Sequence, residues 1–270
     1  MTVASMPLFW LMAKPPGHPP GRRRGGRSTG ALGKEPVAPV PAQPWMDTGA
    51  AAHDSSESPL IPKVIHYSYK LDLNDTSRPF PSITFALSWR AWRRHFPEGE
   101  FRYQFWSDDD NRRCIEEHFP QYLEDWLAMP DRPEKFDTAR YCYLYAHGGV
   151  YQDLDYEPLR CFYDELEAGY VSLIGSPYSE GSLPPADKAQ RGFEVQNALM
   201  ASPKRHPFWL LVFWWIFVQG KGKSHAWNAP YGSGPRMLGS AANQYPEVPV
   251  MELPANVFQP VTQSLSRYQK

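Results

Sequence analysis

Residues 134–159 read EKFDTARYCYLYAHGGVYQDLDYEPL, and this stretch decides the fold. Its first half has helical spacing and carries Asp137 and Arg140, and a short strand after the Gly-Gly pair ends in Asp153 and Asp155. A helix from Asp137 to the glycines rises roughly 15 Å, at about 1.5 Å per residue. The strand returns roughly 13 Å, at about 3.3 Å per residue. We therefore expect the strand end to lie level with Asp137 and Arg140.

Three carboxylates and a guanidinium at one strand end are poor material for a core and suit a metal ion and a diphosphate. Asp153 and Asp155 point the same way from a strand, so one can hold Mg²⁺ or Mn²⁺ while the other reaches sugar hydroxyls. Such an ion stabilises the charge on a departing diphosphate, and the planar fork of Arg140 can bind donor oxygens. Asp137 can orient that arginine or bind sugar hydroxyls. The pattern indicates nucleotide-sugar transfer.

A second acidic triplet, Asp108 to Asp110, has the same Asp-x-Asp spacing. It follows Ser107, so we interpret it as the capped first turn of a helix. The alternative for Asp153 and Asp155 is a solvated acidic turn, but they close an apolar strand opposite an Asp-x-x-Arg helix.

Length and charge limit the function classes. The 270 residues allow one α/β domain plus a tail, and the net charge of −1 gives no support for nucleic-acid binding. No apolar stretch reaches the roughly 18 residues that span a bilayer, and Phe208 to Val218 reads as a buried helix.

Residues 1–58, rich in Pro and Gly, predict a disordered tail whose arginine cluster is either solvated or a targeting or lipid-surface element. We interpret Cys114, Cys142 and Cys161 as buried thiols, the first two in helices, which leaves the redox compartment open.

The folded region, 59–270, alternates strands with helices, which predicts a single α/β domain with a mixed, mostly parallel sheet. The expected strands are 60–69, 101–106, 149–153 and 170–174. The expected helices are 83–95, 107–118, 122–129, 134–147, 194–200 and 207–219.

These segments resemble glycosyltransferase family 32, over roughly residues 60–260. IPKVIHYSYK (61–70), YQFWSDDDNRRCI (103–115) and EKFDTARYCYLYAHGGVYQDLD (134–155) are similar to its first strand, its second strand and helix, and its core signature. GFEVQNALMASPKRHPFW (192–209) and YGSGPRML (231–238) resemble later segments. Within this family, these segments are most similar to the catalytic subunits that mannosylate inositol phosphorylceramide. The resemblance implies a GT-A-type, Rossmann-like nucleotide-sugar-binding domain.

The resemblance also implies roles for individual residues. Asp155 and Asp153 would be the metal ligands, with Asp153 also contacting ribose and sugar, and Asp137 and Arg140 would bind the donor sugar. Asn197 would lie beside the reacting sugar. Further substrate-binding positions are expected at His66, Tyr67 and Tyr69 near the nucleotide base, and at Gly148, Gly149, Tyr151, Ser233 and Gly234.

Two departures from the family pattern stand out. Phe136 replaces a residue that is small in the family, and we expect it to crowd the start of the helix. Relatives continue past the LPANVFQP segment (253–260) to a tail with His and Trp that completes the metal site, and the sequence up to Lys270 carries no such motif.

We expect a metal-dependent, retaining transferase that moves a hexose, mannose from GDP-mannose first and a UDP-hexose second, to a glycan or sphingolipid acceptor. A membrane-anchored regulatory subunit is an expected partner, and the Golgi or another endomembrane is the expected location. The alternatives are a nucleotide-sugar-binding relative with impaired catalysis and a metal-dependent phosphohydrolase, for which no further ligand motif is found.

Overall fold

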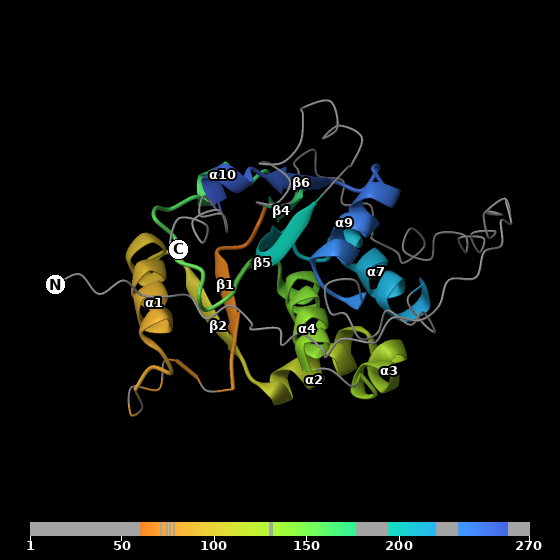
Figure 1. The fold of residues 1–270 in the computed structure, drawn as a ribbon, viewed down its shortest axis with the longest axis horizontal. Coiled ribbons are helices and arrows are strands. Elements are labelled where there is room, and N and C mark those ends of the chain that lie inside the picture. The colour runs from red at the N-terminus through yellow and green to blue at the C-terminus, as the bar shows by residue number, and fades with distance from the viewer. Residues whose placement is uncertain are drawn as a thin grey trace, which may run out of the picture. The chain divides into compact units, whose positions relative to one another are not determined.

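Six strands form one mixed sheet in the order β2-β1-β3-β5-β4-β6 (Figure 1). The computed structural model describes residues 60–70, 72–73, 75, 77, 79–129, 132–176, 194–219 and 232–258, so the predicted tail lies outside the described residues. The strands β2, β1 and β3 run parallel, as do β4 and β6, whereas β5 is antiparallel to both of its neighbours. This arrangement confirms the predicted α/β class with a mostly parallel sheet. The strands are β1 Val64–Ser68, β2 Arg102–Trp106, β3 Gly149–Gln152, β4 Val171–Gly175, β5 Val195–Ser202 and β6 Val250–Leu253.

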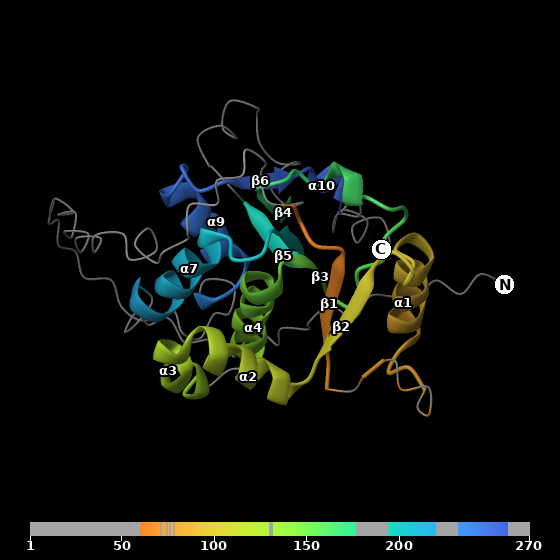
Figure 2. The same ribbon diagram turned by 180° about the vertical axis from the view of Figure 1, so that it is seen from behind.

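Helices cover both faces of the sheet, as Figures 1 and 2 show from opposite sides. On one face, Tyr151 and Met200 pack with residues of α2, α4, α7 and α9. On the other, Val150 and Leu199 pack with Trp92 of α1 and with the segment that follows β3. The helices are α1 Ile83–His95, α2 Asp108–His118, α3 Leu123–Leu127, α4 Arg132–His147, α7 Pro207–Trp214, α9 Pro235–Gln244 and α10 Ala255–Phe258, with a π-helical turn η3 at Trp215–Gln219 and 3₁₀ turns η1 at Pro120–Tyr122 and η2 at Tyr163–Glu165.

The Gly-Gly turn between α4 and β3 needs glycine at both positions. Gly148 and Gly149 have φ values of 63° and 100°, which residues with a side chain rarely adopt. A Cβ on Gly149 would also lie 2.5 Å from the Val64 carbonyl oxygen in β1. The turn therefore reverses the chain from α4 into the parallel neighbour of β1 at the amino end of β3.

The helix predicted at 194–200 is wrong, because this segment forms β5. The helix-favouring Ala198, Leu199 and Met200 lie in an eight-residue strand that fills the gap between β3 and β4. Pairing on both edges outweighs a weak local helix preference, since packing routinely overrides propensity.

The interpretation of all three cysteines as buried thiols is also wrong. The two residues form a disulfide that joins α2 to α4, whereas Cys161 is free and exposed. Sequence spacing gave no sign of the pairing because the two cysteines meet only through the packing of the two helices.

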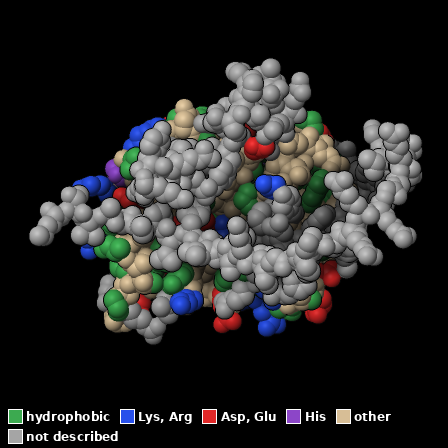
Figure 3. Space-filling view, viewed as in Figure 1, with side chains coloured by type: hydrophobic (Ala, Val, Ile, Leu, Met, Phe, Trp, Pro, Cys, Tyr) green, Lys and Arg blue, Asp and Glu red, His purple; other side chains and the backbone are tan. Residues whose placement is uncertain are grey.

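Two surface properties bear on function. On the face shown in Figure 3, described Lys and Arg side chains are interspersed with Asp and Glu rather than gathered by sign. Among the described helices, none is long and apolar enough to cross a membrane.

Candidate active site

The site lies at the edge of the sheet where three parallel strands end. Register pairs His66 of β1 with Tyr151 of β3 and with Gln104 of β2, so the carboxyl ends of these strands lie side by side. Asp153 follows β3 directly, and its backbone N–H donates to the Ala198 carbonyl of β5 at 2.8 Å. The antiparallel β5 thus adds its own residues to the same edge.

The Arg140 guanidinium connects the helix α4 to this strand end. One of its terminal nitrogens lies 3.1 Å from Asp153 Oδ1 and donates to the Asn197 carbonyl at 3.0 Å. The other lies 3.4 Å from Asp137 Oδ1, one helical turn earlier. The guanidinium also stacks 4.7 Å from the Tyr151 ring centre, and Tyr151 donates its hydroxyl to Asp153 Oδ1 at 2.8 Å. The predicted meeting of helix and strand residues is confirmed.

Asp137 is held on two sides by neutral donors. The Asn197 amide nitrogen donates to its Oδ1 at 2.8 Å, and the Ser233 hydroxyl donates to its Oδ2 at 3.2 Å. Sequence reasoning missed Tyr141, whose hydroxyl donates to the Ser233 carbonyl at 2.6 Å and accepts from the Asn197 amide at 3.2 Å. Its position four residues after Asp137, on the same helical face, was the available signal.

Burial and charge set the titration of these groups. Burial raises the pKa of Asp137 to about 6, and the neighbouring Arg140 opposes that rise. Burial likewise raises the pKa of Asp153, against the pull of Arg140. The two carboxylates hold the pKa of Arg140 above its ordinary value despite its burial. The arginine stays charged, and its Nε has no hydrogen-bond partner in the described part of the chain.

The carboxylates that could hold a metal differ in their surroundings. Asp155 is exposed and, among the described residues, has no hydrogen-bond or ion-pair partner. Asp153 engages Oδ1 with Arg140 and Tyr151, which leaves Oδ2 for a ligand. Two carboxylates fit a Mg²⁺ or Mn²⁺ ion whose other ligands come from a diphosphate and water. In the described ranges, no three His, Cys, Asp or Glu residues gather as a metal-binding group.

His66, expected near the nucleotide base, is buried with both ring nitrogens engaged. Trp106 donates to Nδ1 at 3.0 Å, so Nε2 carries the proton and donates to the Gly148 carbonyl at 2.7 Å. Burial lowers the pKa of His66 to about 3, so the ring is neutral. The structure therefore leaves no ring nitrogen of His66 for a ligand.

The other predicted substrate-binding residues divide between the site and its surroundings. Ser233 and Gly234 lie where α9 begins, and Ser233 reaches Asp137 directly. Tyr67 is buried, and Tyr69, partly exposed just beyond β1, packs edge-on against Phe85 of α1. Gly148 and Gly149 lie at the opposite end of β3 from Asp153, so the structure does not bring the two glycines into the site.

A cavity of about 380 Å³ lies at the start of α4. Its walls come from the first turn of α2, the end of α3 and the start of α4, where Phe136 precedes Asp137. Phe136 contributes to this wall, and α4 starts before it at Arg132, so the expected crowding does not displace the helix start. Ser107 and Asp110 form the predicted helix cap beside the cavity, as reciprocal hydrogen bonds show. The lining residues are Asp108, Asp109, Asn111, Arg112, Trp126, Leu127, Lys135 and Phe136.

Comparison with known proteins adds to this geometry. Residues 84–173 match the family described as "Glycosyltransferase sugar-binding region containing DXD motif". This range contains Asp137, Arg140, Asp153 and Asp155 and ends before Asn197.

Two yeast relatives are similar over longer ranges. Inositol phosphoceramide mannosyltransferase 3 of Schizosaccharomyces pombe is 30% identical over 58% of this chain and 38% of its own length. Mannosyl phosphorylinositol ceramide synthase CSH1 of Saccharomyces cerevisiae is 28% identical over 70% of this chain and 45% of its own length. The chain therefore spans less than half of each relative. A solved structure, "PaToxG Glycosyltransferase", is 15% identical and covers 71% of this chain and 72% of its own, with a TM-score of 0.47.

Proposed function

We propose that this chain, which belongs to the family of glycosyltransferases with a DXD motif, transfers a hexose from a nucleotide sugar, with mannose from GDP-mannose as the favoured donor. The proposed acceptor is a lipid or a glycan, and the proposed stereochemistry is retention. One observation carries the proposal. A mostly buried, permanently charged Arg140 bridges Asp137 and Asp153 at the ends of parallel strands, beside an exposed Asp155.

The residues of the site divide the work of donor binding. Arg140 holds Asp137 and Asp153 through its two terminal nitrogens and so presents a fixed positive charge beside the proposed metal ligands. Asp137, kept in place by Asn197 and Ser233, can accept a hydrogen bond from a sugar hydroxyl. These groups are positioned before the donor binds, which reduces the entropy lost in reaching the reactive geometry.

The proposed cofactor is Mn²⁺ or Mg²⁺, held by Asp155 and by Oδ2 of Asp153. When bound, such an ion would neutralise the charge that develops on the departing diphosphate. The adjacent Arg140 would share that charge as a fixed cation, because its two aspartate partners favour the protonated form.

The 380 Å³ cavity at the start of α4 supports a guanine-containing donor. It combines the aromatic side chains of Trp126 and Phe136 with the exposed carboxylate of Asp109. A purine can stack on an aromatic ring, and a carboxylate can accept from the adjacent ring and amino N–H groups of guanine. Uracil presents only one such N–H, so a UDP-hexose is the second choice of donor.

A sphingolipid is the proposed acceptor because relatives bear the names of inositol phosphoceramide mannosyltransferases. A membrane-anchored regulatory subunit is a proposed partner. The Cys114–Cys142 disulfide supports an oxidising compartment, such as the lumen of the Golgi or another endomembrane. The second candidate function is a donor-binding relative with weak turnover. It is favoured by the finding that, in the described residues, no third acidic or histidine ligand joins Asp153 and Asp155.

A donor screen tests the proposal. The purified chain is incubated with GDP-mannose, UDP-glucose and UDP-galactose, with Mn²⁺ or with chelator, and release of the nucleoside diphosphate is measured. We expect metal-dependent hydrolysis that is fastest with GDP-mannose. Asp109→Asn should reduce the preference for GDP-mannose over the UDP-sugars, with the exposed Asp164→Asn as the matched control. Donor binding without turnover would select the second candidate.

A further inference from the structure

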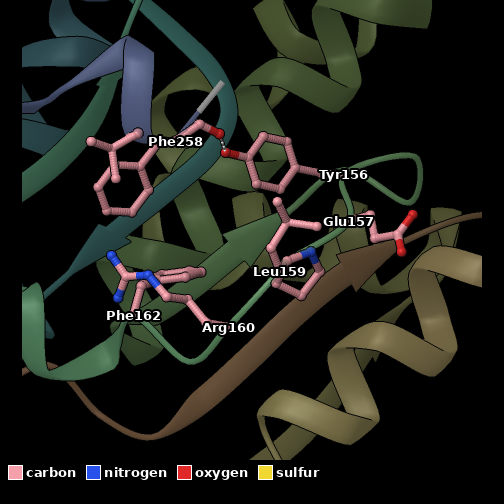
Figure 4. Close-up of a pocket in the computed structure, with 8 residues that line it drawn as sticks. Tyr156, Glu157, Leu159, Arg160, Phe162 and Phe258 are labelled. Atoms are coloured by element: carbon pink, nitrogen blue, oxygen red, sulfur yellow. Dashed lines mark hydrogen bonds between the residues drawn. The ribbon is translucent and has the colours of Figure 1, made fainter. Parts of the chain in front are cut away.

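A second cavity, of about 500 Å³, lies on the α1 face of the sheet (Figure 4). The segment that follows β3 forms one wall and the short helix α10 forms another. Figure 4 shows Phe162 and Phe258 on one side, Glu157 at the other end, and Tyr156 and Leu159 between them. The lining residues are Tyr156, Glu157, Pro158, Leu159, Arg160, Phe162, Val257 and Phe258. We call this cavity the Leu159 groove.

The Leu159 groove begins where the acidic site ends. Tyr156 follows Asp155 directly, and its backbone N–H donates to the Asp153 carbonyl at 2.9 Å. Its own carbonyl accepts from the Ser88 hydroxyl at 2.8 Å and from the Trp92 indole at 2.7 Å, both on α1. The wall of the groove is therefore fixed to the same turn that carries the proposed metal ligands.

The groove offers apolar surface and few free polar groups. Leu159 is 78% exposed and Val257 is 50% exposed, although both are large apolar side chains. The Tyr156 hydroxyl already donates to the Phe258 carbonyl, and the Arg160 guanidinium already pairs with Glu165. Among the described lining side chains, only the exposed Glu157 carboxylate, at one end, remains for a polar ligand, whereas a hydrocarbon chain needs no polar partner.

We propose that the Leu159 groove binds the hydrocarbon chain of a lipid acceptor and directs its polar head towards Asp155. The inference rests on the proposed function, which places a donor sugar at that end. The volume of the Leu159 groove lies within the roughly 300–1,000 Å³ that is typical of ligand pockets. Asp155 directly precedes the groove wall at Tyr156, which sets the direction of the amphiphile. Its chain would lie between Leu159 and Phe258, and its head would lie beside the exposed Asp155.

The first test measures binding without any donor. Butyl, hexyl and octyl esters of inositol 1-phosphate are titrated into the full chain by calorimetry. Burial of each methylene should tighten binding by up to about fourfold, so we expect the octyl ester to bind at least about tenfold more tightly than the butyl ester. Equal affinities for the three esters would overturn the proposal.

Leu159→Gln locates the effect. It changes an exposed side chain, so we expect the chain to stay folded, and the gain from butyl to octyl should fall below about threefold as the apolar wall is lost. The matched control is Leu87→Gln, which alters a 45% exposed leucine of α1 outside the groove and should keep the full gain. An unchanged gain in Leu159→Gln, or an equal loss in both variants, would place the chain elsewhere.

Mannose transfer to the same esters separates this inference from the proposed function. With both correct, KM for the ester should fall as the chain lengthens, and Leu159→Gln should abolish that trend. Mannose transfer with equal KM for all esters would support the proposed transferase function and contradict binding of the hydrocarbon chain in the Leu159 groove. Leu159-dependent binding with no transfer would leave a hydrocarbon site and reject its acceptor role.

Discussion

Arg140 of α4 and Asp153 at the end of β3 lie 3.1 Å apart, although a helix end, a two-glycine turn and a whole strand separate them in the chain. The contact depends on helix and strand having matched lengths on either side of the turn. It places a cation beside two carboxylates at the sheet edge, where neither the charge nor the carboxylates serve the core. This contact is the basis of the first prediction.

Arg140→Lys should behave as a damaging substitution. Lysine keeps the charge but cannot bind Asp137, Asp153 and a donor oxygen together through one planar group. We expect kcat/KM for donor hydrolysis to fall about tenfold or more, which is roughly 1.4 kcal/mol of transition-state stabilisation. Steady-state kinetics and urea unfolding of both proteins provide the measurement.

Arg113→Lys is the matched control, because Arg113 is an exposed arginine that also pairs with an aspartate, Asp110. It should leave turnover unchanged. If Arg140→Lys instead lowers stability while turnover per folded molecule stays at the wild-type value, the arginine is a structural ion-pair residue.

Asp155→Asn should abolish metal-dependent donor turnover and leave the fold intact. The substitution removes the charge of an exposed carboxylate that, in the described residues, holds nothing else in place. Mn²⁺ titration by calorimetry in the presence of GDP, together with thermal unfolding, separates lost metal binding from lost structure.

Asp110→Asn provides the comparison for that result. Asp110 belongs to the other acidic triplet and caps α2, so its replacement should cost about 1 kcal/mol of stability and no turnover. Equal losses of activity in the two variants would show that the wrong triplet has been assigned to the metal.

Local patterns predicted much of this fold because they agree with the tertiary structure. The helix predicted at 83–95 is α1, and Ser107 predicted the start of α2. The Gly-Gly turn predicted where the chain reverses, and so predicted that Asp153 lies level with Asp137 and Arg140. In each case the decisive interactions lie within a few residues of one another.

The failures share the opposite property, because they depend on contacts between distant segments. The segment around Leu199 is a strand because it pairs with both β3 and β4. Cys114 and Cys142 are brought together only by the packing of α2 on α4. Tyr141 was missed because its partners, Asn197 and Ser233, come from segments far along the chain. The resemblance named Asn197 and Ser233, but their contacts with Asp137 became visible only in the structure.

Stability should depend on pH through Asp137. Its folded pKa of about 6 lies above its ordinary value of 3.8, so the folded state holds the proton more tightly than the unfolded state. The stability from this group is full below about pH 4 and is lost as the pH rises through about 6, on the order of 2 kcal/mol. Asp137→Asn should remove this decline, as urea unfolding from about pH 4 to about pH 7 will measure.

Other carboxylates also titrate in this range, so the informative quantity is the difference between variant and wild type. Asp164→Asn, at an exposed aspartate on the short turn at Tyr163–Glu165, makes the same chemical change away from the site and should leave the decline in place. Parallel curves for Asp137→Asn as well would mean that Arg140, Asn197 and Ser233 offset the burial of this carboxylate completely.

Loss of the Cys114–Cys142 disulfide should destabilise the fold and disturb the site indirectly. The bridge closes a sequence separation of 28 residues, and constraining the unfolded chain over such a loop contributes about 3–4 kcal/mol. The double substitution Cys114→Ser/Cys142→Ser should lower the free energy of unfolding by about that amount, and Cys161→Ser, at the free cysteine, should not. Dithiothreitol should lower the thermal midpoint of the wild type but not that of the double variant.

Because α4 carries Asp137 and Arg140, the double variant should also raise KM for the donor more than it lowers kcat. A wild-type midpoint that does not respond to dithiothreitol would restore the interpretation of two buried thiols and remove the support for an oxidising compartment.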